Sequence, residues 1–155
     1  MTRMAAQLKE AQQSGIYQFV RRPEEVEDAA REAGLAVFRI DLHDAHDKKG
    51  FLDKIAQALH FPAWFGGNWD ALNDCLTDLD WLPSQTGYVL VFENAEHFGS
   101  HHKTEFDNAA AVLDAVSEYW RAQSRPFWSF VQAGTGWESR LRTWPGQGPF
   151  LGETP

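Results

Sequence analysis

Residues 61–76 read FPAWFGGNWDALNDCL, and this stretch marks the start of a helix whose two faces differ in polarity. One proline and two glycines disfavour helix in the first half of the stretch. Asn68 then supplies a side chain suited to cap a helix that begins at Trp69. The stretch therefore predicts a loop that leads directly into a helix.

The residues after Trp69 divide into an apolar face and a polar face. The apolar residues recur at helical spacing and are Leu72, Cys75, Leu76 and Leu79. The opposite face carries Asp70, Asn73, Asp74, Thr77 and Asp78. Three carboxylates thus lie one turn apart without a Lys or Arg among them, although such like charges destabilise a helix by about 0.2 to 0.5 kcal/mol per pair.

This acidic face has two interpretations. It can be a binding surface for a cationic partner, or its carboxylates can be ordinary solvated charges. The helix dipole favours Asp70 in the first turn and disfavours Asp78 near the last turn, so the dipole alone does not account for all three charges.

The composition is that of an acidic globular protein. The chain has 155 residues, which suits one domain with its own core, and a formal net charge of −8. This charge argues against binding to a nucleic-acid backbone and favours a basic protein as partner. Cys75 is the only cysteine, so no internal disulfide can form. Because the sequence shows neither the apolar segment of a signal peptide nor a membrane span, we expect a cytoplasmic location.

Strands and helices alternate along the first half of the chain. Residues 5–13 predict a short amphipathic helix, and residues 16–20 (IYQFV) predict a strand. Pro23 begins a helix that ends at Gly34, and a strand follows over residues 35–42 (LAVFRIDL). A further helix over residues 48–60 leads into the loop before Trp69.

The second half continues this alternation. Residues 88–92 (YVLVF) predict a buried strand, and a turn of helix is expected at residues 95–98. Thr104 can cap a helix that reaches Arg121, and residues 126–132 (PFWSFVQ) predict the fourth strand. This order indicates a parallel sheet with right-handed crossovers. We expect the strand at residues 16–20 to pair beside the strand at residues 35–42.

The C-terminal segment, residues 133–155, combines repeated Gly and Pro with Trp137, Trp144 and Phe150. Flexible tails contain few aromatic residues. We therefore expect this segment to lie across the body of the domain and to cover apolar surface.

The sequence WFGGNWDALNDCL, from Trp64 to Leu76, resembles the signature of the barstar family, the intracellular inhibitors of barnase-type ribonucleases. The signature is an aromatic pair, Gly, any residue and Asn, followed by D-A-L-x-D-x-L. The resemblance extends more loosely over residues 35–132. It implies an α/β fold with a barstar-like parallel sheet of three core strands packed with helices, to which residues 16–20 would add an N-terminal fourth strand. We expect one domain over residues 1–155, with an N-terminal extension (1–34), a barstar-like core (35–132) and a C-terminal segment (133–155).

The resemblance also implies which residues bind the partner. Asp70 and Asp74 correspond to the two carboxylates that barstar directs into the cationic active site of its ribonuclease in place of RNA phosphates. Glu118 corresponds to an acidic residue that also contacts the enzyme, although it can equally be a solvated glutamate. Carboxylates on a rigid helix can satisfy the Arg, Lys and His donors that otherwise hold a phosphate. The neighbouring residues expected to bind the partner are Trp64, Gly66, Asn68, Trp69, Asn73 and Thr77.

The chain departs from the family pattern at several contact positions. Trp64 and Phe65 stand where barstar has two tyrosines, Gly67 and Ala122 stand where it has acids, and Asn73 stands where it has a tryptophan. The partner surface is therefore expected to differ in shape, and barnase itself need not be the target.

Two other kinds of chemistry compete with this interpretation. His43 and His46 follow one predicted strand, and His97, His101 and His102 follow another, but their spacing matches no zinc pattern and predicts surface loops. A hydrolase that holds Mg²⁺ between Asp70 and Asp74 would also need a cleft, a base and further ligands, which the sequence does not reveal. We therefore expect no catalytic residue, no metal and no cofactor.

The function expected from the sequence is that of a bacterial immunity protein. Its acidic helix face would block the active site of a basic bacterial ribonuclease or ribonuclease toxin. The first alternative is a non-inhibitory protein-binding module on the same scaffold, and the second is a metal-dependent hydrolase. The expected partner is a protein rather than a nucleic acid or a membrane, and the free protein is expected to be a monomer.

Overall fold

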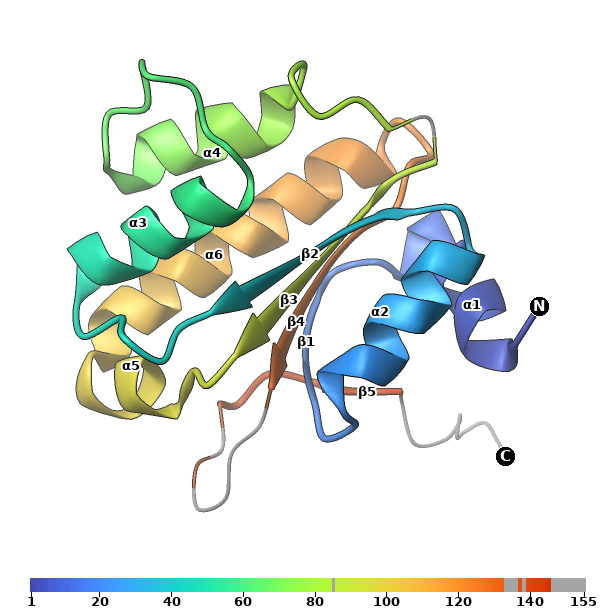
Figure 1. The fold of residues 1–155 in the computed structure, drawn as a ribbon, viewed down its shortest axis with the longest axis horizontal. Coiled ribbons are helices and arrows are strands. Elements are labelled where there is room, and N and C mark those ends of the chain that lie inside the picture. The colour runs from blue at the N-terminus through green and yellow to red at the C-terminus, as the bar shows by residue number, and fades with distance from the viewer. Residues whose placement is uncertain (85, 133–136, 138, 146–155) are drawn as a thin grey trace.

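The chain forms a five-stranded parallel sheet with helices packed on both of its faces (Figure 1). The computed structural model describes residues 1–84, 86–132, 137 and 139–145. The strand order across the sheet is β2-β3-β4-β1-β5. This architecture confirms the predicted α/β class.

Most strands and helices lie close to the predicted ranges, but β5 was not predicted, and the helix expected over residues 5–13 is divided into α1 and a 3-10 turn. The strands are β1 (Ile16–Phe19), β2 (Ala36–Asp41), β3 (Tyr88–Glu93), β4 (Phe127–Gln132) and β5 (Thr143–Trp144). The helices are α1 (Arg3–Leu8), α2 (Pro23–Glu32), α3 (Lys48–Ala58), α4 (Trp69–Asp78), α5 (Glu96–His101) and α6 (Lys103–Arg121), and a 3-10 turn η1 spans Ala11–Gln13. The five strands found among the described residues hydrogen-bond into one sheet, and we propose on this basis that residues 1–155 form one domain.

The sheet separates two apolar cores. On one face, α3 to α6 pack over alternate residues of the central strands, such as Leu90 and Phe92 of β3. On the other face, α1 and α2 cover Val89 and Val91 of the same strand. Figure 1 shows these two groups of helices on opposite sides of the strands. Burial on both faces explains why the sequence of β3 is a continuous apolar run.

The position of β1 differs from the expected one. β1 pairs with β4 on one side and with β5 on the other, so the expected pairing beside β2 is wrong. Its Tyr17 ring lies 5.7 Å from Trp128, and its Phe19 ring lies 6.0 Å from Phe130, measured between centroids. Burial of these aromatic pairs outweighs the tendency of consecutive strands to be neighbours.

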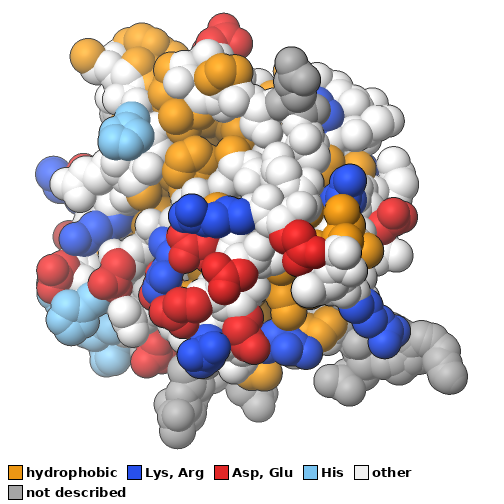
Figure 2. Space-filling model, turned by 45° about the vertical axis from the view of Figure 1, so that its right-hand side comes forward, with side chains coloured by type: hydrophobic (Ala, Val, Ile, Leu, Met, Phe, Trp, Pro, Cys, Tyr) orange, Lys and Arg blue, Asp and Glu red, His pale blue; other side chains and the backbone are white. Residues whose placement is uncertain are grey.

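On the edge strand β2, Arg39 is surrounded by carboxylates of β3 and α2. The Arg39 guanidinium donates hydrogen bonds to both carboxylate oxygens of Glu93, at 2.6 and 2.8 Å, and to Glu24 and Glu27 of α2, each at 3.3 Å. The space-filling view in Figure 2 shows a patch of acidic side chains with Lys and Arg side chains among them. Such mixed charge suits a solvated edge rather than a strand–strand contact.

The start of α6 also differs from expectation. His102, not Thr104, occupies the N-cap position, and it provides no side-chain cap. Helix α5 ends at His101, and the His102 carbonyl already accepts from the Phe106 N–H at 2.9 Å. Because α5 leads directly into α6, Thr104 lies inside the helix and cannot cap it.

Two aromatic residues of the C-terminal segment contact opposite faces of the protein. The Trp144 ring, in the unexpected strand β5, lies 4.7 Å from the Phe130 ring, and the Trp137 ring lies 5.5 Å from Phe106. A side chain at Gly99 would clash with Trp137, so this glycine provides the space for the ring. Phe150 lies outside the described residues. Among the described residues, no helix is long and apolar enough to cross a membrane.

Candidate functional site

Helix α4 begins where the sequence predicts. The Asn68 side chain accepts a hydrogen bond from the Ala71 N–H at 2.8 Å, which caps the helix at Trp69. The helix ends at Asp78, and its C-cap residue is Leu79, a buried residue in the left-handed conformation with φ of 52°. The apolar stripe of Leu72, Cys75 and Leu76 is fully buried.

Two tryptophans fasten α4 to α6. Near the start of α4, the Trp69 indole N–H donates to Glu105 at 3.2 Å. Near its end, the Leu76 carbonyl accepts from the Trp120 indole N–H at 2.9 Å. Glu105 and Trp120 lie at opposite ends of α6, so the two helices run side by side in the same direction (Figure 1). Fixing both ends makes α4 a rigid support for its outer face.

The outer face of α4 is acidic and exposed. Asp70, Asp74 and Asp78 are all exposed, and none of the ion pairs among the described residues includes them. Glu118 is exposed on α6, two residues before Trp120. Because α4 and α6 run parallel, Glu118 belongs to the part of α6 that lies beside the C-terminal half of α4. The predicted acidic residues therefore come from two adjacent helices.

The loop before α4 presents an aromatic side chain. Trp64 is 57% exposed, and its ring lies edge-on to Trp81 at 6.3 Å. Phe65, by contrast, is half-buried, and its ring centroid lies 4.9 Å from that of Phe61. Gly67 has a φ of 70°, and a side chain there would meet no atom within 4 Å, so this position requires a backbone conformation rather than space.

Three predicted contact residues are half-buried on the flanks of α4: Trp69, Asn73 and Thr77. The Trp69 ring packs 5.8 Å from Phe51, and the Lys48 ammonium lies 5.6 Å from its centroid. The Thr77 hydroxyl donates to the Asn73 carbonyl at 2.8 Å. These side chains support the helix and leave only part of their surface for a partner.

A comparison with protein families matches this geometry to a known group. Residues 35–132 match the family model described as barstar, the barnase inhibitor. The chain belongs to the barstar family. Members of this family are inhibitors rather than enzymes. The matched range contains α4 and α6, whereas β1, α2 and β5 of this barstar-family protein lie outside it. A search of curated proteins finds no match.

Three residues near the acidic face were not identified from the sequence: Asp80, Trp81 and Tyr119. The backbone N–H of Asp80 donates to the Asp78 carboxylate at 3.3 Å, and the charge of Asp78 raises the pKa of the Asp80 carboxyl. Tyr119 is 46% exposed beside Glu118. The only signal for Asp80 in the sequence is the Asp-x-Asp spacing that it forms with Asp78 at the end of α4. No local pattern in the sequence places Tyr119 near the acidic face.

His46, in the loop before α3, lies close to His97 and His101, which belong to helix α5 rather than to the expected loop. The His97 ring is stacked 4.4 Å from His101 and lies edge-on to His46 at 5.1 Å. Desolvation lowers the pKa of the exposed His97, and the neighbouring His101, His46 and His102 lower it further. Among the described residues, no group of three or more His, Cys, Asp or Glu is placed to hold a metal ion.

The Cys75 thiol should be inert in the folded protein. Burial, reinforced by the carboxylates of Asp74 and Asp78, raises its pKa to about 11. The thiolate is the reactive form, so alkylation by iodoacetamide at pH 8 should be much slower in native buffer than in concentrated urea. Raising the pH above the ordinary thiol pKa should also lower stability, because only the unfolded thiol then ionises. Equal alkylation rates would contradict this, and Cys75→Ala should remove the stability effect.

Proposed function

We propose that this barstar-family protein binds a basic ribonuclease and blocks its active site with the outer face of α4. The observation that carries the proposal is the row of three exposed carboxylates on a helix fixed at both ends. No described residue neutralises them by an ion pair. Asp70 and Asp74 would occupy the positions of RNA phosphates, and Glu118 would add a third contact from α6.

The outer face of α4 offers complementary charge on a preorganised surface. A site that cleaves RNA holds Arg, Lys and His side chains around a phosphate, and carboxylates accept the same hydrogen bonds. The Trp69 and Trp120 contacts hold α4 in place before binding. Little conformational freedom would then be lost when the complex forms.

The neighbouring residues would adapt the surface to a particular target. Trp64, exposed beside Trp81, would serve as an aromatic anchor of the kind enriched in interfaces. Gly66 and Asn68 would contribute through the loop, and Trp69, Asn73 and Thr77 through the exposed parts of their side chains. We infer a target other than barnase, because Trp64, Gly67 and Asn73 change the shape of this surface. We also propose that the free protein is a cytoplasmic monomer that silences a bacterial nuclease there.

The direct experiment is an inhibition assay against a panel. The panel would contain barnase, other small basic bacterial ribonucleases and the product of any neighbouring reading frame that encodes a small basic protein. Stoichiometric loss of RNA cleavage with at least one of them, relieved by the double substitution D70N/D74N, would support inhibition. Binding without loss of cleavage would instead support a non-inhibitory binding module, and absence of binding across the panel would count against the proposal.

Association with the ribonuclease should depend strongly on salt. Opposite charges steer the two proteins together, and the Debye length falls from about 10 Å at 0.1 M ionic strength to about 3 Å at 1 M. Stopped-flow association rates should therefore fall steadily as NaCl is raised, whereas dissociation rates should change little. An association rate that is insensitive to ionic strength would rule out charge steering by α4.

A further inference from the structure

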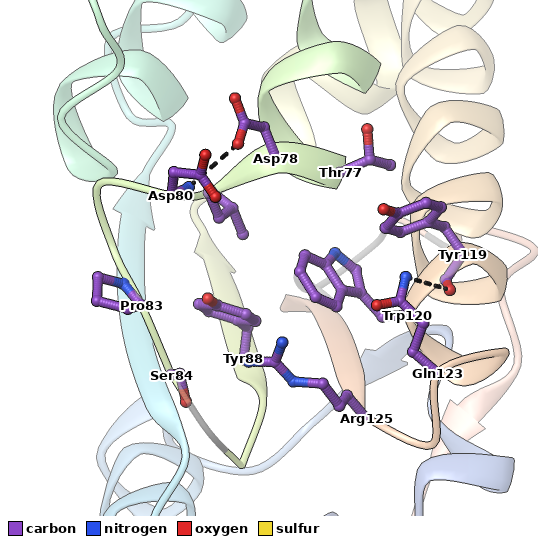
Figure 3. Close-up of a pocket in the computed structure, with 11 residues that line it drawn as sticks. Thr77, Asp78, Asp80, Pro83, Ser84, Tyr88, Tyr119, Trp120, Gln123 and Arg125 are labelled. Carbon is purple, nitrogen blue, oxygen red and sulfur yellow. Dashed lines mark hydrogen bonds between the residues drawn. The ribbon is translucent and has the colours of Figure 1, made fainter.

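A cavity of about 630 Å³ opens beside the C-terminal end of α4. Its wall is formed by the end of α4, the loop that follows α4, the first residue of β3 and the end of α6 (Figure 3). The lining side chains include Asp78, Asp80, Tyr88, Tyr119, Trp120 and Arg125. Thr77 also lines the cavity, so the cavity continues the surface proposed to bind the ribonuclease.

One end of the cavity is acidic. Asp78 and Asp80 lie next to each other there, and the Asp80 N–H donates to the Asp78 carboxylate at 3.3 Å (Figure 3). Neither carboxylate forms an ion pair within the part of the chain that the structure describes. Two adjacent carboxylates repel each other, and a bound cation would relieve that repulsion.

Aromatic rings form the middle of the wall. Trp120 and Tyr119 are in edge-on contact, with centroids 5.4 Å apart, and Tyr119 is 46% exposed. The Tyr88 ring lies 5.5 Å from Trp120 on the other side. Flat aromatic surfaces suit the aliphatic stem and the cationic head of a Lys or Arg side chain.

The opposite end of the cavity offers a hydrogen-bond donor. The Arg125 guanidinium lies 4.8 Å from the Trp120 centroid and 5.9 Å from that of Tyr88. Its Nε is buried and has no hydrogen-bond partner among the described residues. The guanidinium lines this end of the cavity and can only donate hydrogen bonds, so this end favours a carbonyl or carboxylate oxygen.

We propose that this cavity receives a Lys or Arg side chain of the bound ribonuclease, with its charged head beside Asp78 and Asp80 and a backbone carbonyl of the same segment near Arg125. The proposal rests on the proposed function, because the occupant comes from the same basic partner. Charge complementarity and the continuity with Thr77 both favour this occupant. Asp78 and Asp80 would then be specificity determinants separate from Asp70 and Asp74.

The first test uses a small probe and needs no ribonuclease. N-acetyl-argininamide, which has a guanidinium and two carbonyl groups, would be titrated into the isotope-labelled protein and followed by NMR. We expect saturable shifts at the Trp120 indole N–H and the Asp80 amide, with a dissociation constant on the order of millimolar. N-acetyl-norleucinamide, which lacks the charge, and the double variant D78N/D80N with the argininamide should show no saturable shifts. No saturation with the argininamide, or equal binding in either control, would overturn the cavity as a cation site.

The second test uses the ribonuclease complex. D78N/D80N should weaken the complex on the order of tenfold and raise the urea midpoint of the free protein, because the repelling pair is removed. A merely structural role would instead lower the urea midpoint. If the ribonuclease binds this double variant as tightly as the wild type, the proposed occupant is wrong while the inhibitory function stands. If the argininamide binds but no ribonuclease does, the cavity is a cation site and the proposed function fails.

Discussion

Replacing Asp74 by alanine should weaken binding to the target ribonuclease by about a hundredfold or more. The substitution would leave buried cations of the enzyme without their partner, which costs about 3 kcal/mol of binding free energy. Asp74 is exposed in the middle of α4 and pairs with no described residue, so its removal should leave the stability of the free protein nearly unchanged. Isothermal titration calorimetry would give the affinity, and urea denaturation would give the stability.

A matched control separates the position of the charge from the overall charge of the protein. Asp28 is exposed on α2, which packs on the other face of the sheet, and Asp28→Ala changes the net charge by the same amount. Its effect on the affinity should be small and should vanish at high salt. Equal losses in Asp28→Ala and Asp74→Ala would mean that the overall charge, rather than the face of α4, accounts for binding.

Replacing Trp120 by alanine should have the second large effect. This residue of α6 is buried against α4 and Tyr88. Truncation of a buried tryptophan costs about 3 to 5 kcal/mol. It would also remove the hydrogen bond to the Leu76 carbonyl, which holds the C-terminal end of α4. Urea denaturation would measure the loss of stability.

Trp128→Ala is the appropriate companion variant. Trp128 is fully buried on the other face of the sheet, and its indole N–H donates to the Leu8 carbonyl at 2.8 Å. We expect a comparable loss of stability in both variants. Only Trp120→Ala should weaken binding when affinities are compared at a temperature at which both variants are folded. If both folded variants bound equally well, the fastening of α4 by Trp120 would not contribute to recognition.

The local elements were predictable because their signals lie within a few residues. Asn68 specifies the start of α4, the spacing of Leu72, Cys75 and Leu76 specifies its buried face, and the absence of charges in residues 88–92 indicates a central strand. The partner of β1 was not predictable in the same way. It depends on contacts of Tyr17 and Phe19 with Trp128 and Phe130, which are more than a hundred residues away in the sequence.

The candidate site was also predictable only where its signals are local in the sequence. Asp70 and Asp74 could be predicted from helical periodicity and from the resemblance to the barstar signature, because both signals lie within a single helix and the loop before it. The cavity beside Asp78 does not, because Tyr119 and Arg125 reach it from the end of α6 and beyond. The two-residue strand β5 was missed for a similar reason, since Trp144 is held by Phe130 and Trp128 rather than by a local strand pattern.

The most direct test of the central claim is competition for the active site of the ribonuclease. The affinity of the inhibitor would be measured at increasing concentrations of a mononucleotide that occupies the phosphate-binding site of the enzyme. If the carboxylates of α4 replace RNA phosphates, the apparent dissociation constant should rise linearly with the nucleotide concentration, without reaching a plateau, and no ternary complex should form. A dissociation constant that stays unchanged at saturating nucleotide would contradict the claim that α4 blocks the active site.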